Sequence, residues 1–136
     1  FSIERHSGTL EIDVEDQVDA LMVTEQGAVI QLHLDFLQRQ PARGCKVIGA
    51  EGTLVWDCLA NALSLQSQSG TTQLFSDPAF ERNRMYIDEI VGFDNFVGGR
   101  APPVVSLQHG LTVMRLIDAL RQSAATHMPV LLGDSC

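Results

Sequence analysis

The ten residues AVIQLHLDFL at positions 28–37 alternate between apolar and polar side chains. Successive side chains of a β-strand point to opposite faces, so this period of two predicts a strand with one buried face. The apolar face holds Ala28, Ile30, Leu32, Leu34 and Phe36, and the opposite face holds Gln31, His33 and Asp35, with Val29 and Leu37 at its ends. We expect the polar face to stay uncovered.

Further strands are predicted on both sides of this segment. Apolar or alternating runs bounded by turn residues occupy 1–5, 19–24, 45–48, 53–57 and 63–68. Residues 49–52, GAEG, join two of these runs as a hairpin loop, because glycine tolerates a positive φ. Residues 69–72 are expected to close the strand region.

The second half of the chain changes to helical spacing. Asp77 and Pro78 are typical of a helix start, since Asp caps the first turn and Pro needs no N–H there. This helix is expected to end at 98–99, two glycines, and a second helix to begin after Ser106. A short last strand is expected at 130–132. The apolar helix positions are Tyr86, Ile90, Phe93 and Val97, then Val113, Leu116, Ile117, Leu120 and Ala124.

Strands followed by helices predict an α+β fold with an open, mainly antiparallel sheet and helices packed on one face. The 136 residues suit a single domain, 1–136. The uncovered face, which carries His33 and Asp35, is then expected to bind a ligand or another subunit. Trp56, in one of the predicted strands, is expected to pack in the core or an interface.

Charge and composition exclude several classes of function. The net charge is −8 and the nine basic residues form no cluster, which argues against nucleic acid and anionic membranes. No apolar run approaches the ~20 residues of a membrane span. Cys45, Cys58 and Cys136 lack metal-ligand spacing, so we interpret them as structural or incidental and expect no metal site. Their odd number fits free thiols in a reducing compartment, and we expect a cytoplasmic protein.

Four local patterns resemble the C-terminal domain of the Gfo/Idh/MocA oxidoreductases. Residues 14–16, VED, precede a strand, and residues 47–54, VIGAEGTL, look like the family's iGeeGtl hairpin. Residues 86–93, YIDEIVGF, and 110–124 look like its two helices. One departure is Gln108-His109, where the family often has an acidic residue. The resemblance implies the C-terminal fold of the glucose-fructose oxidoreductase and dihydrodipicolinate-reductase type.

The same resemblance implies that the family's N-terminal Rossmann domain is absent from this chain. The family's Gly-rich dinucleotide turn, its Glu-Lys-Pro motif and its Asp-x-x-x-His pair do not occur, and Lys46 is the only lysine. We therefore expect no catalytic or cofactor-binding residue here, and NAD or NADP only in the intact protein. Because Phe1 opens a strand without a polar lead-in, we expect the chain to begin partway through a longer protein.

In the intact enzyme, the resemblance implies action on a sugar, polyol or related hydroxy compound. This part would form one wall of the substrate pocket and a homo-oligomer interface, as in a dimer, through the open sheet face, and would be inactive alone. His33 and Asp35 could bind a polyol or pack on a second subunit. Arg39 could hold a carboxylate or phosphate, or be solvated. Glu15 and Asp16 could contact substrate or satisfy neighbouring N–H groups.

Two other hypotheses stay open. The chain could be a stand-alone dimerisation or interaction module without catalytic activity, which pairs through its open sheet. It could also be a small enzyme that uses His33 and Asp35 as acid and base, which would require a buried pocket with shifted pKa values.

Overall fold

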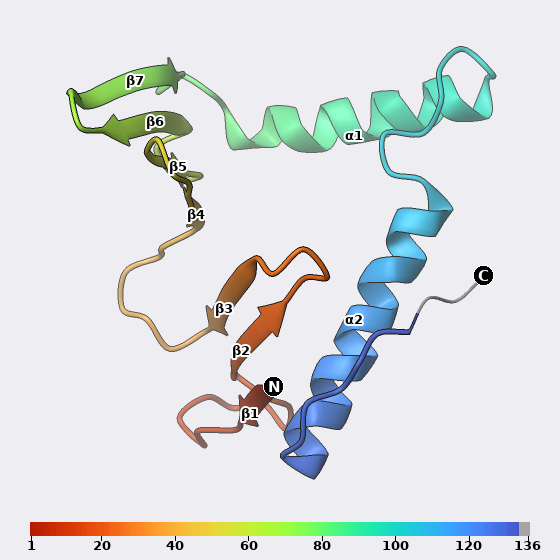
Figure 1. Ribbon diagram of the computed structural model, residues 1–136. Helices are drawn as coiled ribbons and strands as arrows, with labels where there is room; N and C mark the ends of the chain where they lie inside the picture. Colours follow the sequence, from red (N-terminus) through yellow and green to blue (C-terminus); the bar gives the residue numbers. More distant parts are fainter. Residues whose placement is uncertain (134–136) are drawn as a thin grey trace. The chain divides into compact units, whose positions relative to one another are not determined.

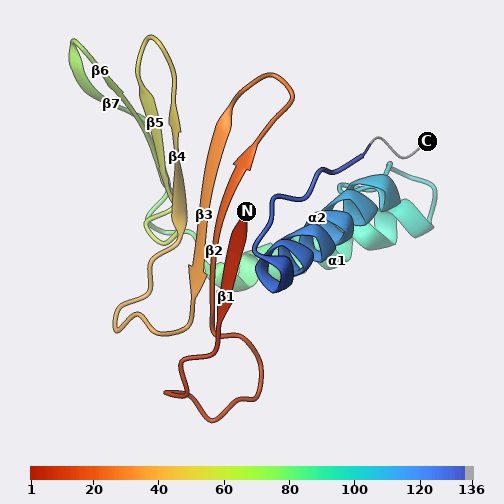
Figure 2. The same cartoon turned by 60° about the horizontal axis from the view of Figure 1, so that its bottom comes forward.

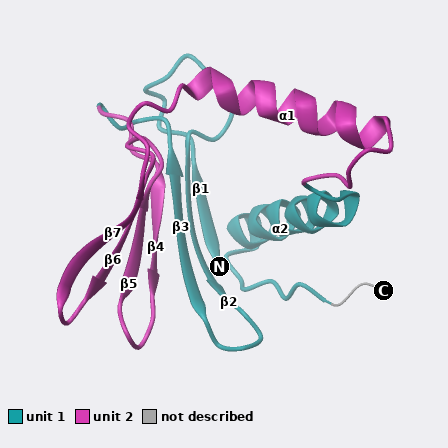
Figure 3. Cartoon of the chain, turned by 90° about the horizontal axis from the view of Figure 1, so that it is seen from above, with its two compact units in different colours: residues 1–39, 105–136 teal, residues 40–104 magenta. Residues whose placement is uncertain are grey.

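The computed structural model describes residues 1–133 (Figure 1). The chain divides into two compact units (Figure 3). Unit 1 comprises Phe1–Arg39 and the chain from Val105 onward, and unit 2 comprises Gln40–Val104. The expectation of a single domain over 1–136 stays a prediction.

Unit 1 contains a three-stranded antiparallel sheet in the order β1-β2-β3. The strands are β1 (Ser2–Arg5), β2 (Gln17–Val23) and β3 (Val29–Asp35). The predicted strands at 1–5, 19–24 and 28–37 are thus confirmed. The expected burial of the apolar face at 28–37 is wrong, since Ile30, Leu34 and Phe36 are 44%, 56% and 75% exposed, because α2 packs on β1 at the other edge of the sheet. Strand β3 stops at Asp35. It stops there because the Asp35 carboxylate binds the N–H groups of Leu37 and Gln38, which turns the chain out of the sheet.

Helix α2 (Leu107–Thr126) packs against β1, the edge strand of this sheet. Figure 2 shows the C-terminal end of α2 beside β1, where the Ser2 N–H donates to Ser123 Oγ at 3.0 Å. Ser2 pairs with Ala20 in the sheet, and Ser2, Ala20 and Ser123 are all buried. Ser106 caps the helix as predicted, since its side chain accepts from the His109 N–H. The face that carries His33 points away from α2, because neighbouring positions alternate between faces.

Unit 2 contains a four-stranded antiparallel sheet in the order β4-β5-β6-β7. The strands are β4 (Gly44–Ile48), β5 (Thr53–Asp57), β6 (Ala62–Ser67) and β7 (Gly70–Ser76). The predicted hairpin at 49–52 is confirmed by a bond from the Gly49 N–H to the Gly52 carbonyl. The α+β class and the antiparallel pairing are likewise confirmed, with the strands in two ladders.

The predicted end of the strand region at 69–72 is wrong. Gly70, at φ 119°, instead makes a tight turn, and the chain pairs back on β6 as β7. The alternation is hidden in this segment because a bulge between Leu63 and Ser64 shifts the pairing by one residue.

Helix α1 (Arg82–Val97) begins later than the sequence predicted. Asp77 does not cap it: the Asp77 carbonyl accepts from the Phe80 N–H in a separate turn, and Glu81 occupies the N-cap without a side-chain bond. The glycines at 98–99 end the helix as predicted, and Gly99 takes the left-handed conformation at φ 67°.

The expected last strand at 130–132 is also wrong, since these residues form no ladder. Ser123 Oγ donates to the Met128 carbonyl at 2.8 Å, which holds the start of the segment at the end of α2. Neither helix in the described part of the chain could cross a bilayer.

Candidate functional site

Three titratable side chains meet on the face of the unit 1 sheet opposite α2. Asp19 of β2 lies directly across from His33 of β3 in the ladder. His33 Nδ1 lies 2.6 Å from Asp19 Oδ1, and His33 Nε2 lies 2.7 Å from Asp35 Oδ2. We call Asp19, His33 and Asp35 the imidazole–carboxylate cluster. Sequence reasoning found His33 and Asp35 but missed Asp19, because the register of β2 on β3 is not written in either strand alone.

The geometry of the cluster favours the protonated form of His33. A neutral imidazole carries one N–H, whereas both ring nitrogens of His33 face a carboxylate oxygen. The hydrogen bonds from His33 to Asp19 and then to Asp35 raise the pKa of His33. Hydrogen bonds from His33 and Gln17 lower the pKa of Asp19, and the bond from His33 has the larger effect. With His33 protonated, the three side chains together carry one negative charge.

Asp35 holds the turn that follows β3. Its Oδ1 accepts from the backbone N–H groups of Leu37 at 2.7 Å and Gln38 at 2.9 Å. Its Oδ2 accepts from His33 and from Gln38 Nε2. These hydrogen bonds lower the pKa of Asp35 to about 2, and the bond from the Gln38 side chain has the largest effect. The Asp35 side chain is 4% exposed and its acceptor positions are filled by the chain itself, so it fixes the backbone of this turn.

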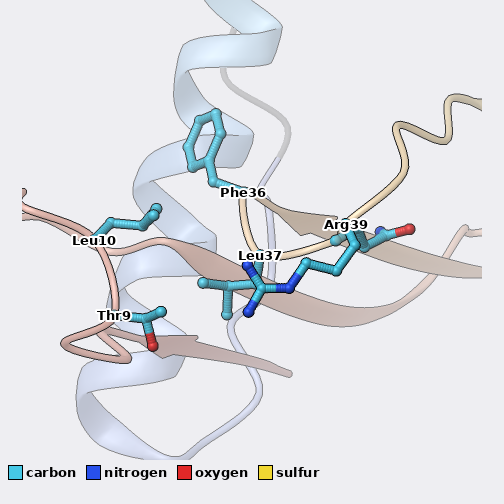
Figure 4. Close-up of a pocket in the computed structure, with 6 residues that line it drawn as sticks. Thr9, Leu10, Phe36, Leu37 and Arg39 are labelled. Carbon is cyan, nitrogen blue, oxygen red and sulfur yellow. The ribbon is translucent and has the colours of Figure 1, made fainter.

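A hollow of about 360 Å³ opens beside the same turn. It is lined by Thr9 and Leu10 from the β1–β2 loop and by Phe36, Leu37, Gln38 and Arg39 after β3 (Figure 4). We call it the Arg39 hollow, since Arg39 is its single charged lining residue. Gln38 joins it to the cluster, because this side chain both lines the hollow and donates to Asp35. The structure thus brings together all three predicted site residues, His33, Asp35 and Arg39, around one turn.

Asp16 fixes the opposite wall of the hollow. Its carboxylate accepts from the Ser7 N–H at 3.0 and 3.1 Å, and Ser7 Oγ accepts from the Thr9 N–H. The bond from the Ser7 hydroxyl is the main cause of the lowered pKa of Asp16. Asp16 is 1% exposed. Of the two roles left open for Asp16, these contacts support the structural one, whereas Glu15 is exposed.

Several other candidates lie outside this region. Cys45 and Cys58 are free thiols, and Cys136 falls outside the described residues. Trp56 is 41% exposed and pairs with Cys45 and Leu63 across the unit 2 sheet. Within residues 1–133, no group of three His, Cys, Asp or Glu side chains could hold a metal ion.

The described residues do not fit a dinucleotide. Such a site needs a parallel βαβ unit with a Gly-rich turn that aims N–H groups at the pyrophosphate. Every strand pair in residues 1–133 is antiparallel, and the sequence contains no G-x-G-x-x-G. The described residues are therefore assigned no part in holding the dinucleotide.

Comparison with known families gives one match that spans nearly the whole chain. The family model described as the oxidoreductase family, C-terminal alpha/beta domain, of the Gfo/Idh/MocA type, matches residues 3–132. No curated protein matches the sequence.

Solved structures share the fold at low sequence identity. A UDP-N-acetylglucosamine 3-dehydrogenase from Acidithiobacillus ferrooxidans is 20% identical with a TM-score of 0.74, over 93% of this chain and 40% of that one. An oxidoreductase from Agrobacterium radiobacter, solved with NAD+, L-tartaric acid and magnesium, is 15% identical with a TM-score of 0.73, over 93% and 41%. An oxidoreductase domain protein from Kribbella flavida is 16% identical with a TM-score of 0.70, over 92% and 40%. The chain therefore spans about 40% of the length of these structures.

Proposed function

Because this chain belongs to the C-terminal α/β domain family of the Gfo/Idh/MocA oxidoreductases, we propose that it forms the substrate side of an NAD(P)-dependent oxidoreductase. The family match over residues 3–132 carries this proposal. The intact protein would transfer hydride between nicotinamide and a carbon of a sugar, polyol or related hydroxy compound. A separate dinucleotide-binding part would supply the cofactor, since the described residues do not fit one.

Two comparisons support the substrate class. One protein of the same fold is a UDP-N-acetylglucosamine dehydrogenase, and another was solved with NAD+ and a hydroxy acid, L-tartaric acid. That the chain spans about 40% of these structures supports its place as one part of a two-part enzyme, inactive alone.

Within this function, Arg39 is proposed as the residue that contacts substrate. Asp35 and His33 would act as positioning residues, because their polar atoms are bonded within the chain and hold the turn before Arg39. Direct contact of His33 or Asp35 with a polyol stays a prediction, and so does the cytoplasmic location.

The open face of the unit 1 sheet is the proposed homo-oligomer interface. Ile3, Leu21, Val23 and Val29 are exposed there at 47% to 67%, around the imidazole–carboxylate cluster. With His33 protonated, the charges of Arg5 and His33 balance those of Asp19 and Asp35 on this face, whereas the whole chain carries −8. A second copy can meet this face with little charge repulsion and bury apolar side chains.

The same exposed face favours the alternative of a dimerisation module without catalysis. Sedimentation of the full chain and of its Leu21→Asp variant tests the interface: the proposal expects an oligomer that the variant disrupts. A monomeric wild-type chain at high concentration would rule this interface out for the chain alone.

Nicotinamide fluorescence tests the division of labour. We expect NADH or NADPH to bind the complete polypeptide, in which a dinucleotide domain precedes this chain, and not the 136-residue chain. Saturable binding of either dinucleotide by the 136-residue chain would overturn the proposal.

A further inference from the structure

We propose that the Arg39 hollow binds the anionic group, a carboxylate or a phosphate, of a small hydroxylated molecule. The inference rests on the proposed function in one respect: it takes this molecule to be the substrate and so gives the substrate a negative charge. Binding itself can be measured without cofactor or turnover.

The hollow carries a positive charge although the chain as a whole is negative. The sequence has 17 acidic and nine basic residues, yet none of the six lining residues is acidic and one is arginine. Arg39 joins no salt bridge within the described range. Its planar guanidinium can donate two parallel hydrogen bonds to a carboxylate or phosphate. In Figure 4 the Arg39 side chain extends toward Leu37, another residue that lines the hollow.

The remaining lining suits a hydroxylated body attached to the anionic group. Thr9 offers a hydroxyl and Gln38 an amide, which can bond to hydroxyl groups. Leu10, Phe36 and Leu37 supply apolar surface for C–H groups. A volume of about 360 Å³ lies at the small end of the range for ligand sites, which suits a molecule of one sugar unit or less.

Two buried carboxylates hold the walls of the hollow in place. Asp35 fixes the turn that carries Leu37 and Gln38, and His33 fixes Asp35. Asp16 fixes the loop that carries Thr9. The two walls are joined directly, because the Phe36 N–H donates to the Asp16 carbonyl at 3.0 Å. Walls held this way lose little conformational entropy when a ligand binds.

Calorimetric titration of the full chain tests the inference. The ligands are gluconate, glucose 6-phosphate and, as the neutral comparison, glucose. The variants are Arg39→Gln and, as a matched control, Arg43→Gln, which removes an arginine four residues along that does not line the hollow. We expect an anion to bind the wild type and the Arg43→Gln variant equally. Arg39→Gln should weaken it about tenfold or more, and glucose should bind at least that much more weakly.

Two further arms refine the result. Gluconate against glucose 6-phosphate identifies which anionic group the site prefers. Arg39→Lys keeps the charge without the paired geometry and should recover part of the affinity. Equal binding of glucose, an equal loss in both arginine variants, or no binding of either anion would overturn the inference. Failure of hydride transfer in the complete enzyme would instead count against the proposed function and leave the binding result standing.

Discussion

The two sheets of this chain follow the same antiparallel pattern and differ in what covers them. In unit 1, α2 packs on the face that holds Ser2 and Ala20, and the described residues that are fully buried all lie in this unit. In unit 2, no residue is buried, and the row Cys45, Trp56, Leu63 and Phe75 lies on one apolar face with Trp56 and Phe75 about half exposed.

This difference suits unit 1 to a ligand site and unit 2 to contact with a protein partner. The unit 1 sheet is held by α2 at β1, and it carries the imidazole–carboxylate cluster on its far face and the Arg39 hollow beside the turn after β3. The sheet of unit 2 keeps apolar surface that a protein partner of matching character can cover. Unit 1 therefore provides the candidate ligand site.

The largest expected effect on stability is the difference between a charge placed in the unit 1 sheet and one placed in the unit 2 sheet. Ala20→Asp puts an unpaired carboxylate under α2 and should lower the free energy of unfolding by about 3 kcal/mol. Val47→Asp, on the exposed apolar face of unit 2, should change it by less than about 1 kcal/mol. Urea denaturation of both variants measures the contrast. Equal losses would show that the unit 2 face is as closely packed as that of unit 1.

A smaller effect is expected at the contact between α2 and β1. Ser123→Ala removes the acceptor of the buried Ser2 N–H and should cost about 2 kcal/mol of unfolding free energy. Ser69→Ala, at an exposed turn of unit 2, should be nearly neutral and serves as the control. Chemical denaturation gives both values. A neutral Ser123→Ala would mean that water reaches the Ser2 N–H and that α2 does not seal the sheet.

The two helix starts should respond in opposite directions. Ser106→Ala removes the cap of α2 and should cost about 1 kcal/mol. Glu81→Ser gives α1 the cap that it lacks and should add up to about 1 kcal/mol. Thermal unfolding followed by circular dichroism compares the two. A stabilised Ser106→Ala variant would contradict the observed cap.

The pH dependence of stability should show the smallest effect, because His33 is half exposed. The raised pKa of His33 stabilises the folded state fully below pH 6.5. This stabilisation is lost as the pH rises through the pKa that His33 has in the folded state. The lowered pKa values of Asp19 and Asp35 stabilise the folded state fully above pH 3.8. This stabilisation is lost as the pH falls through the folded-state pKa of each group, which for Asp35 is about 2.

The cluster should therefore stabilise the fold most between pH 3.8 and 6.5. His33→Gln should flatten the loss on the alkaline side, and Asp35→Asn that on the acid side. Urea midpoints across this range measure both. An unchanged alkaline limb in His33→Gln would show that His33 is not protonated between the two carboxylates.

The sequence predicted elements wherever local chemistry is unambiguous. The alternation at 28–37, the GAEG hairpin and the Ser106 cap all express a short-range rule. The sequence-based predictions were wrong where tertiary pairing overrides such a rule. Asp77-Pro78 satisfies a helix-start pattern but forms a separate turn, and Gly70 starts a strand that a bulge disguises.

The candidate site was predictable only in part for the same reason. His33 and Asp35 share a face within one strand, so their proximity follows from a period of two. Asp19 and Asp16 depend on the register of β2 against its neighbours, and the β1–β2 loop reaches Arg39 only through the folded sheet. No local pattern in a single sequence records such contacts.

The most direct test of the central claim is the formation of reduced nicotinamide by the complete polypeptide. The assay would offer NAD+ or NADP+ with a panel of sugars, polyols and their acidic derivatives. The account predicts turnover with at least one of these hydroxy compounds, and none with the 136-residue chain. Turnover by the 136-residue chain, or a complete polypeptide without any dinucleotide-dependent oxidation of hydroxy compounds, would contradict it.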